Sequence, residues 1–447
     1  MKNGEEALVA QGVHTLIAQF TDIHGVAKGK WVPLPHLDAL LTDGVGFSGP
    51  SIAGTGLPRM GARSEYHGRG LASTLRPLPW MPGFARIVCE GFVDAKPFEA
   101  CPRQVLSRQV ERLAKRGWTL QTGIEPEFFL LQQGSAGIAP ADARDCLDKP
   151  SYDLRSLSRQ QEFLSRLTAG LNGCGLDVLQ VDHEDAHAQF EINFQHADVL
   201  TSADNLMLFK LAAHALAEQG GMLFSLMPKP FADQPGSGMH FHASLWEGAG
   251  EKMRCLFRDA AGHAASGGLS PLARQFVAGV LQHSAALCAL AAPTVNSYKR
   301  LRVGETLSGT SWAPAHVAHG PNNRTALVRT LPGRFEWRLP DASANPYLAS
   351  AALIAAGLDG IERHLDPGPA CTDDLFAMPA AEVQARGIAL LPQSLGAAVD
   401  ALEANAPLRE ALGSALHGEF VRLKRGEHDD HARHVSAWEL ERYAARF

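Results

Sequence analysis

Two glutamates set into an apolar run place the strongest constraint on how this chain can fold. Glu125 and Glu127 lie in the stretch GIEPEFFLL, residues 123–131. In a β-strand, residues two apart project from the same face, so both carboxylates point the same way among apolar neighbours. Like charges at close range repel, and burial of an unpaired charge is costly. The stretch therefore predicts a strand whose polar face looks into a functional site.

Acidic or imidazole side chains recur on three further predicted strands. Taken singly, each glutamate is best interpreted as a solvated surface residue and each histidine as a satisfied core residue. Five glutamates and a histidine that face one cavity, however, would repel one another unless cations compensate. Carboxylates with one imidazole suit Mg²⁺ or Mn²⁺. The residues that the strands offer to such a metal site are Glu125, Glu127, Glu184, Glu191 and Glu336, with His240 and His242 alternating on one strand.

Arginines form a second group. Guanidinium groups bind phosphate and carboxylate bidentately, so arginines near a metal indicate anionic substrates. Metal and arginine together are typical of phosphoryl transfer, where positioning and charge neutralisation supply most of the catalysis. The chain has no Walker A motif and no GxGxxG motif, so neither a P-loop nor a Rossmann site is expected. A surface ion-pair network is the simpler interpretation for any single arginine. The group is Arg300, Arg324, Arg329, Arg334 and Arg338.

Composition excludes several classes of protein. The chain has 447 residues, 45% of them hydrophobic and 20% charged, with a net charge of −6. These values are ordinary for a soluble enzyme and indicate no nucleic-acid or membrane partner. The seven cysteines are odd in number and form no CxxC pair, which predicts reduced thiols in a cytoplasmic protein.

The order of predicted elements indicates an N-terminal domain, residues 1–100, and a second domain, residues 101–447. Residues 13–34 predict a hairpin around an Asp-Ile-His-Gly turn. Residues 54–72 predict a loop, and Pro102 predicts the first turn of a helix. Beyond it, strands and helices interleave, and antiparallel pairing is expected. The predicted strands are 119–131, 187–194, 238–246 and 334–341, and the predicted helices are 155–173, 204–219, 271–293 and 345–365.

In these motifs the chain resembles the glutamine synthetase family, and the resemblance extends over nearly the whole chain. The nearest subgroup is the type III-like enzymes, which include γ-glutamylmethylamide synthetases. No single motif would settle the matter, but together they are highly specific. The segments that carry the resemblance are FTDIHGVAKGKWVPL, GIEPEFFLL, HAQFEINF, MPKPF, GSGMHFHASLW, NSYKRL, NNRTALVRT and FEWRLPDASANPYLASAALIAAGLDGI.

The resemblance implies an α+β fold, with an N-terminal β-grasp domain and a C-terminal catalytic α/β domain built on an antiparallel half-barrel sheet with helices. It implies a cytoplasmic homododecamer of two stacked hexameric rings, with active sites between neighbouring subunits. It also implies a role in nitrogen metabolism. ATP would phosphorylate L-glutamate to γ-glutamyl phosphate, and an amine would then attack that acyl phosphate to give an amide, ADP and phosphate.

Roles for individual residues follow from the matching motifs. The resemblance implies one metal ion on Glu127, Glu184 and Glu191, and a second on Glu125, His240 and Glu336. It implies contacts to glutamate from Gly236, His242, Arg300 and Arg338, and contacts to the nucleotide or its phosphates from Ser244, Arg329, Arg334 and the catalytic Arg324.

Two departures from the family pattern concern the amine. The ammonium-site aspartate of the family is replaced by Glu65, which is expected to act on a neighbouring subunit's site. The acid of the family's active-site flap is replaced by Trp312, and Glu305 is the only acid nearby in the sequence. An indole removes negative charge and adds a face that attracts cations, so we expect a small primary amine, methylamine above all, as the substrate.

Three alternatives stay open on the sequence. Trp312 could be a packing residue, with ammonia as the substrate of a glutamine synthetase. The amine could be larger, such as ethanolamine or a polyamine, although the basic segment 54–70 disfavours a polyamine. The chain could also be a catalytically silent, ring-forming family member, which the complete set of metal-ligand candidates argues against.

Overall fold

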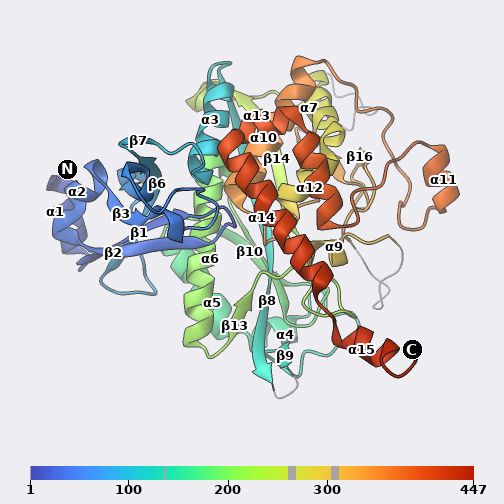
Figure 1. Ribbon diagram of the computed structural model, residues 1–447, viewed down its shortest axis with the longest axis horizontal. Coiled ribbons are helices and arrows are strands. Elements are labelled where there is room, and N and C mark those ends of the chain that lie inside the picture. The colour runs from blue at the N-terminus through green and yellow to red at the C-terminus, as the bar shows by residue number, and fades with distance from the viewer. Residues whose placement is uncertain (1, 135–136, 260–267, 304–311) are drawn as a thin grey trace.

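The computed structural model describes residues 2–134, 137–259, 268–303 and 312–447 (Figure 1). Within them, seven strands form an N-terminal sheet in the order β2-β1-β6-β4-β3, with β5 and β7 pairing with β6. All its pairs are antiparallel except β1 with β6. The strands are β1 (Thr15–Thr21), β2 (Ala27–Pro33), β3 (Val45–Ser48), β4 (Glu65–Gly70), β5 (Arg76–Pro77), β6 (Phe84–Val93) and β7 (Lys96–Pro97). The short helices of this part are α1 (Lys2–Ala10) and α2 (Leu37–Thr42), with 3-10 turns η1 (Leu34–His36), η2 (Gly49–Ser51), η3 (Ala62–Ser64) and η4 (Ala72–Thr74).

The predicted hairpin at 13–34 is confirmed, and the predicted loop at 54–72 is wrong in its second half. Strands β1 and β2 pair antiparallel across the Asp-Ile-His-Gly turn. Residues 65–70, however, form β4, an inner strand of the sheet. Its buried positions are Tyr66, Gly68 and Gly70. Two of these three positions are glycines. The buried face of the strand therefore shows no pattern of alternating hydrophobic residues in the sequence.

A second sheet carries the candidate site. Within the described residues it has eleven strands in the order β10-β11-β8-β14-β18-β17-β16, with β9, β12 and β13 pairing with β8 and β15 with β14. The predicted antiparallel pairing is confirmed for every pair except β16 with β17. The strands are β8 (Trp118–Gly134), β9 (Gly137–Pro140), β10 (Val178–His183), β11 (Gln189–Phe194), β12 (Ala197–Asp198), β13 (Leu223–Ser225), β14 (Met239–Glu247), β15 (Arg254–Cys255), β16 (His319–Pro321), β17 (Val328–Leu331) and β18 (Arg334–Trp337).

Helices pack together beside this sheet, and Figure 1 shows α3, α7, α10 and α13 gathered at one end of the molecule. Helix α10 is buried along almost its whole length. Glycines allow it to approach α7 closely, because a Cβ atom at Gly279 would lie 2.0 Å from the carbonyl oxygen of Ala356. The helices are α3 (Pro102–Ala114), α4 (Leu154–Arg159), α5 (Gln161–Gly173), α6 (Val199–Gln219), α7 (Pro271–Gln282), α8 (Ser284–Ala291), α9 (Ser297–Arg300), α10 (Pro346–Glu362), α11 (Ala380–Ala385), α12 (Leu395–Ala404), α13 (Ala406–Leu412), α14 (Ser414–Arg433) and α15 (Ala437–Tyr443), with the 3-10 turn η5 (Gly250–Lys252).

Two predicted helices are each divided in the structure. The prediction at 155–173 corresponds to α4 and α5, which meet at Gln160. The prediction at 271–293 corresponds to α7 and α8, which meet at His283. The ring of His283 lies 2.8 Å from a carboxylate oxygen of Asp359 and 2.9 Å from the side-chain nitrogen of Asn405. These contacts come from segments far along the chain, so hydrophobic periodicity could not indicate the break.

Helix α3 begins at Pro102, as predicted. The N-terminal sheet ends with β7 at Pro97, so the two sheets separate between these positions. The division into domains 1–100 and 101–447 stays a prediction. Among the described residues, none of the helices combines the length and the apolar character that a membrane span requires.

Candidate active site

The acidic side chains of the second sheet are aligned by the register of its strands. Asp182 on β10 lies directly opposite Glu191 on β11, and Glu191 lies directly opposite Glu127 on β8. On the other side of β8, Glu125 pairs with His240 on β14. Partners in register project from the same face of a sheet. The strand pairing therefore brings these acids to one surface.

That surface is the wall of a cavity of about 580 Å³. All but two of the predicted site residues line it. They are Glu125, Glu127, Glu184, Glu191, Gly236, His240, His242, Arg300, Trp312, Arg324, Arg329, Arg334, Glu336 and Arg338.

The other two lie elsewhere. Ser244 lines an adjoining cavity of about 430 Å³, which shares Glu125 and His242 with the first. Glu65 lies on β4 of the N-terminal sheet, with its side chain 71% exposed and 3.4 Å from the ring of His67. The fold of a single chain therefore does not bring Glu65 to the cavity.

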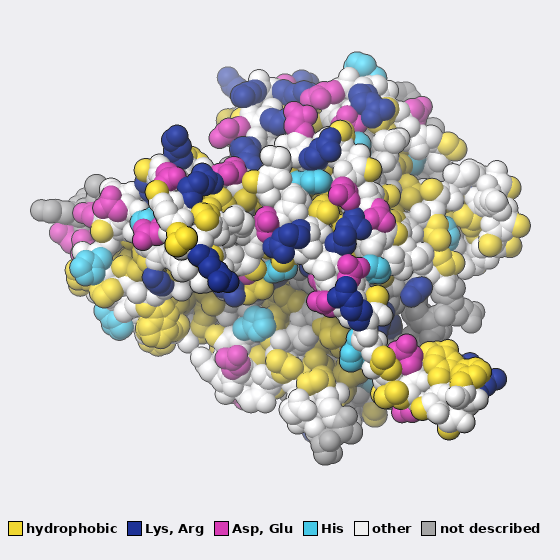
Figure 2. Space-filling model, in the orientation of Figure 1, with side chains coloured by type: hydrophobic (Ala, Val, Ile, Leu, Met, Phe, Trp, Pro, Cys, Tyr) yellow, Lys and Arg dark blue, Asp and Glu magenta, His cyan; other side chains and the backbone are white. Residues whose placement is uncertain are grey.

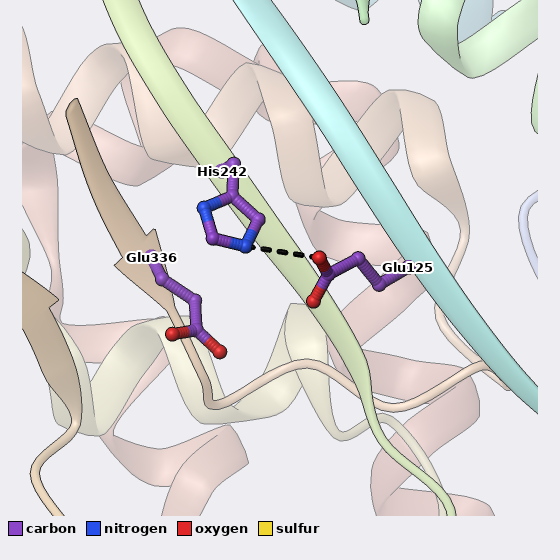
Figure 3. A group of neighbouring side chains, drawn as sticks. All are labelled: Glu125, His242 and Glu336. Atoms are coloured by element: carbon purple, nitrogen blue, oxygen red, sulfur yellow. Dashed lines mark ion pairs between the residues drawn. The ribbon is translucent and has the colours of Figure 1, made fainter. Parts of the chain in front are cut away.

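One group of possible metal ligands contains Glu125, His242 and Glu336, which converge from β8, β14 and β18 (Figure 3). The Nε2 atom of His242 lies 3.1 Å from Oε1 of Glu125. His240 also borders this group, since its Nδ1 lies 3.4 Å from Glu336 and 3.8 Å from Glu125. Both histidines are therefore beside the two carboxylates, whereas the resemblance implied His240 alone.

The pKa values of His240 and Glu336 favour binding of a cation by this group of side chains. Burial, and then the charge of Arg338, holds the pKa of His240 well below its usual value, so the ring is neutral and its nitrogens can bind a metal. Burial alone would raise the pKa of Glu336, but the neighbouring imidazole and guanidinium groups lower it to about 2. Glu336 is therefore a permanent carboxylate at neutral pH.

A second group contains Asp182, Glu184 and Glu191, whose ligand atoms all lie within 4.8 Å of one another. Glu127 borders the group, and its Oε2 accepts hydrogen bonds from the backbone of Gly238 at 2.8 Å and from Gln189 at 2.7 Å. The resemblance implied Glu127 in this group, and the sequence analysis missed Asp182. The spacing of two between Asp182 and Glu184 was the signal that could have found it.

These acids are crowded enough to resist ionisation. Burial raises the pKa of Glu127 to about 7, and burial followed by the charge of neighbouring carboxylates raises the pKa values of Glu184 and Glu191. Among the described residues, the buried Oδ1 atom of Asp182 has no hydrogen-bond partner. Carboxylates without cationic or hydrogen-bonding partners fit a hard divalent cation. The donor set thus agrees with the predicted metal site.

The turn that carries Glu184 is held by a buried pair that the sequence analysis missed. The Nε2 atom of His183 lies 2.7 Å from Asp145, and its Nδ1 lies 2.8 Å from the carbonyl oxygen of Glu184. Asp145 also accepts a hydrogen bond from the backbone of Ala188. Asp145 and His183 are far apart in the sequence, and no local pattern indicates their pairing.

Arginines surround the carboxylate of Glu336. Arg338 donates to its Oε1 at 2.5 Å and Arg329 donates to its Oε2 at 2.9 Å. Arg300 is buried and donates to the backbone carbonyl of Leu339 at 3.0 Å. Arg324 is exposed where it lines the cavity. Cationic groups thus stand beside the acids, which an anionic substrate requires.

The remaining wall combines aromatic and polar side chains. Trp312 is 46% exposed, and its carbonyl oxygen accepts a hydrogen bond from Arg338 at 3.1 Å. Tyr152, Ser151 and Asp185 also line the cavity, and the hydroxyl of Ser151 donates to Asp185. The sequence analysis missed these three. Glu305, the acid nearest to Trp312 in that analysis, lies outside the described residues.

Comparisons with known proteins agree with this fold. Residues 99–443 match the family described as glutamine synthetase, catalytic domain. The chain is 47% identical over 445 residues to a glutamate–methylamine ligase of Methyloversatilis universalis, covering 99% of both chains. It is 36% identical over 430 residues to a glutamine synthetase of Rhizobium leguminosarum bv. phaseoli, covering 96% of both.

Solved structures show the same likeness. A GmaS complex with ADP superposes with a TM-score of 0.92 at 35% sequence identity, and a GmaS structure without ligand with a TM-score of 0.90. Both cover the whole of each chain. The fold is thus shared with proteins described as glutamate–methylamine ligase and glutamine synthetase, the class of enzyme that the sequence analysis anticipated. The chain belongs to the glutamine synthetase family.

Proposed function

We propose that this chain is an ATP-dependent ligase that joins the γ-carboxylate of L-glutamate to methylamine through γ-glutamyl phosphate. The observation that carries the proposal is Trp312, a neutral and half-exposed indole at the wall of a cavity rich in charged side chains. The full-length likeness to a glutamate–methylamine ligase supports it.

The acidic groups of the cavity would hold Mg²⁺ or Mn²⁺. We assign one cation to the region of Glu184 and Glu191 and one to the region of Glu125 and Glu336, with His240 or His242 as the imidazole ligand. Bound there, the cations would neutralise charge on the phosphates and on the attacking carboxylate. Their positive charge would also return the buried acids to the ionised state.

The arginines would hold the anionic partners. We assign Arg324, Arg329 and Arg334 to the phosphates and Ser244 in the adjoining cavity to the nucleotide. Gly236 and Arg300, which border the acids, would bind glutamate. Arg338 is fixed by its bond to Glu336, so its remaining donors are oriented before the substrate arrives, which favours stabilisation of developing charge.

The amine would enter between Trp312, Tyr152 and Asp185. An indole face attracts an alkylammonium ion and also contacts its methyl group, whereas ammonium gains only the electrostatic part. Asp185 is the carboxylate that we assign to bind the ammonium ion and accept its proton before attack. Its bond from Ser151 fixes its orientation. Asp185 would thus supply the negative charge that the family pattern places in the flap.

A second candidate is a glutamine synthetase that uses ammonia. The likeness to several glutamine synthetases at 35–38% identity favours it. The two candidates differ in the amine alone, so amine preference separates them. A larger amine such as ethanolamine is a further outcome of the same measurement.

The test is ADP release with ATP, Mg²⁺ and glutamate at a series of concentrations of methylammonium, ammonium, ethanolamine and putrescine. We expect methylammonium to give the highest kcat/KM. Trp312→Glu should reduce the ratio of methylammonium to ammonium kcat/KM by about tenfold, the scale of one cation–π contact. Trp312→Phe keeps an aromatic face and should retain most of the ratio. An unchanged ratio in Trp312→Glu, or ammonium as the better substrate of the unaltered protein, would refute the proposal.

We also propose a homo-oligomer, with a cytoplasmic dodecamer of two six-membered rings as the expected form. Glu65 lies away from the cavity of its own chain, which supports a site completed by a neighbour. Apolar side chains also gather on the projecting helix α15 (Figure 2). Trp438 and Leu440 there are 58% and 57% exposed, as at surfaces that other chains cover. The seven free cysteines suit a reducing compartment.

A further inference from the structure

Asp182 stands at the end of a row of three carboxylates that strand pairing forces together. It lies in register opposite Glu191, which in turn lies in register opposite Glu127. Like charges placed directly opposite on neighbouring strands destabilise a sheet. The fold keeps this arrangement in the wall of a cavity, so a compensating positive charge is required.

The neighbours of the row do not supply that charge to Asp182. The two hydrogen bonds on Glu127 come from Gly238 and Gln189 and go to its Oε2, and Glu191 accepts one from Asn193 at 3.0 Å. For Asp182, in contrast, the buried Oδ1 is without a hydrogen-bond partner among the residues that the structure describes. That oxygen is therefore available to bind a cation.

The geometry points to Asp182 as a ligand of the divalent cation held with Glu184 and Glu191, beyond the three glutamates that the family resemblance implies. Ligand atoms of these three residues already lie within 4.8 Å of one another. Hard divalent cations take several carboxylate oxygens at once. Glu127, oriented by its two hydrogen bonds, would complete the set from the side of β8. The inference deepens the proposed function, because it concerns the cation that serves the ligase.

The effect of a substitution at Asp182 on the melting temperature should differ with and without the cation, which makes the role testable. Asp182→Asn keeps the shape of the side chain and removes one charge. In the metal-free protein the change relieves repulsion, so the melting temperature should rise. In excess Mn²⁺ the same change removes a ligand, so the shift in melting temperature that Mn²⁺ produces should shrink. A residue with only a structural role would lower the melting temperature under both conditions.

The second measurement is the affinity of the full chain for Mn²⁺ in the absence of ATP and amine. It is made by calorimetry or by electron paramagnetic resonance of free Mn²⁺. Asp182→Asn should weaken Mn²⁺ binding at least about tenfold, the scale on which even outer-shell partners act. Asp177→Asn is the matched control, because Asp177 precedes the same strand, is exposed and lies outside the cavity.

Wild-type Mn²⁺ affinity in Asp182→Asn, or equal melting shifts in Asp182→Asn and the control, would overturn the inference. If Asp182→Asn does not fold, Asp182→Glu is measured instead, because it keeps the charge on a longer side chain. This variant should keep Mn²⁺ binding within about tenfold of wild type. A complete loss of binding would count against a flexible cation site. The binding measurement contains no amine, so a failed methylamine assay would refute the proposed substrate and leave this inference standing.

Discussion

Some residues with a left-handed backbone lie in the cavity wall or next to residues that support it. Tyr152, Ala188 and Asn322 all have positive φ although none is a glycine. Tyr152 lines the cavity, the N–H of Ala188 binds Asp145, and Asn322 accepts hydrogen bonds from Arg329 at 2.6 and 2.9 Å. Strained backbone of this kind persists where surrounding contacts fix it, and it concentrates at functional sites. Asparagine tolerates this conformation, but alanine and tyrosine usually avoid it, so the sequence carries no signal at Ala188 or Tyr152.

Ala95 has the same backbone conformation at a position outside the cavity of the acidic residues. It follows Asp94 in the two-residue turn between β6 and β7, with φ of 59° and an exposed side chain. Turns of this geometry favour glycine at the second position. Ala95→Gly should therefore raise the free energy of unfolding by about 1 kcal/mol. Denaturant unfolding measures it. Ala72→Gly, exposed but without positive φ, should give no gain, and an equal gain in both variants would contradict the prediction.

At the scale of elements, the important quantity is the register between strands. Spacing along one strand indicated that Glu125 and Glu127 share a face, and this is confirmed by the cavity that both line. Which acid faces which acid depended on the pairing of β10 with β11 and of β11 with β8. The pairing of β11 with β8 joins segments that are distant in the sequence. Asp182 and Asp185, which both flank the predicted Glu184, were missed.

Because acidic side chains lie close together on neighbouring strands, we expect the stabilisation of the fold by a metal ion to depend on pH. The pKa of Glu127 is about 7, above its usual 4.5, because burial disfavours the charged form. Between these values the folded protein holds a proton that the unfolded chain has released, so in metal-free protein this group's contribution to stability falls as pH rises. Cations compete with such protons. The increase in the free energy of unfolding produced by Mn²⁺ should therefore grow with pH across this window.

Denaturant unfolding with and without Mn²⁺, at several pH values in that window, measures the increase. Glu127→Gln cannot release a proton and should show a weaker pH dependence. A stabilisation by Mn²⁺ that stays constant or declines as pH rises would show that the buried acids are ionised without the cation.

At the scale of the whole molecule, a buried ionic network joins the N-terminal sheet to the helices. Arg103 on α3 binds both carboxylate oxygens of Asp204 on α6, at 3.0 and 2.9 Å, and Glu90 on β6 at 2.5 Å. Tyr347 on α10 donates to Asp204 at 2.7 Å. Four elements from distant parts of the chain thus meet in one network, three of them at the carboxylate of Asp204. The network thus ties strand β6 of the N-terminal sheet to three helices of the following part of the chain.

Removal of the charge of Asp204 should strongly lower the free energy of unfolding. Asp204→Asn leaves Arg103 with a weakened partner in a buried position, so we expect a loss of about 3 kcal/mol or more in the free energy of unfolding. Glu362→Gln is the matched surface change. Glu362 pairs with Arg116 at 2.5 Å but is 42% exposed, so its loss should be about 1 kcal/mol or less. Similar losses in the two variants would show that the network does not hold the N-terminal sheet to the helices.

Several features could be predicted from local spacing and residue type. These are the charged faces of β8, β14 and β18, the hairpin at the N-terminus, the start of α3 and the family to which the chain belongs. Backbone geometry fixes such features, because side chains alternate along every strand whatever it pairs with. The tertiary structure alone decided the row from Asp182 to Glu127, the support of His183 by Asp145, and the position of Glu65 away from the cavity. Each of these depends on contacts between segments far apart in the chain, and only the packed core and the pairing of strands bring such segments together.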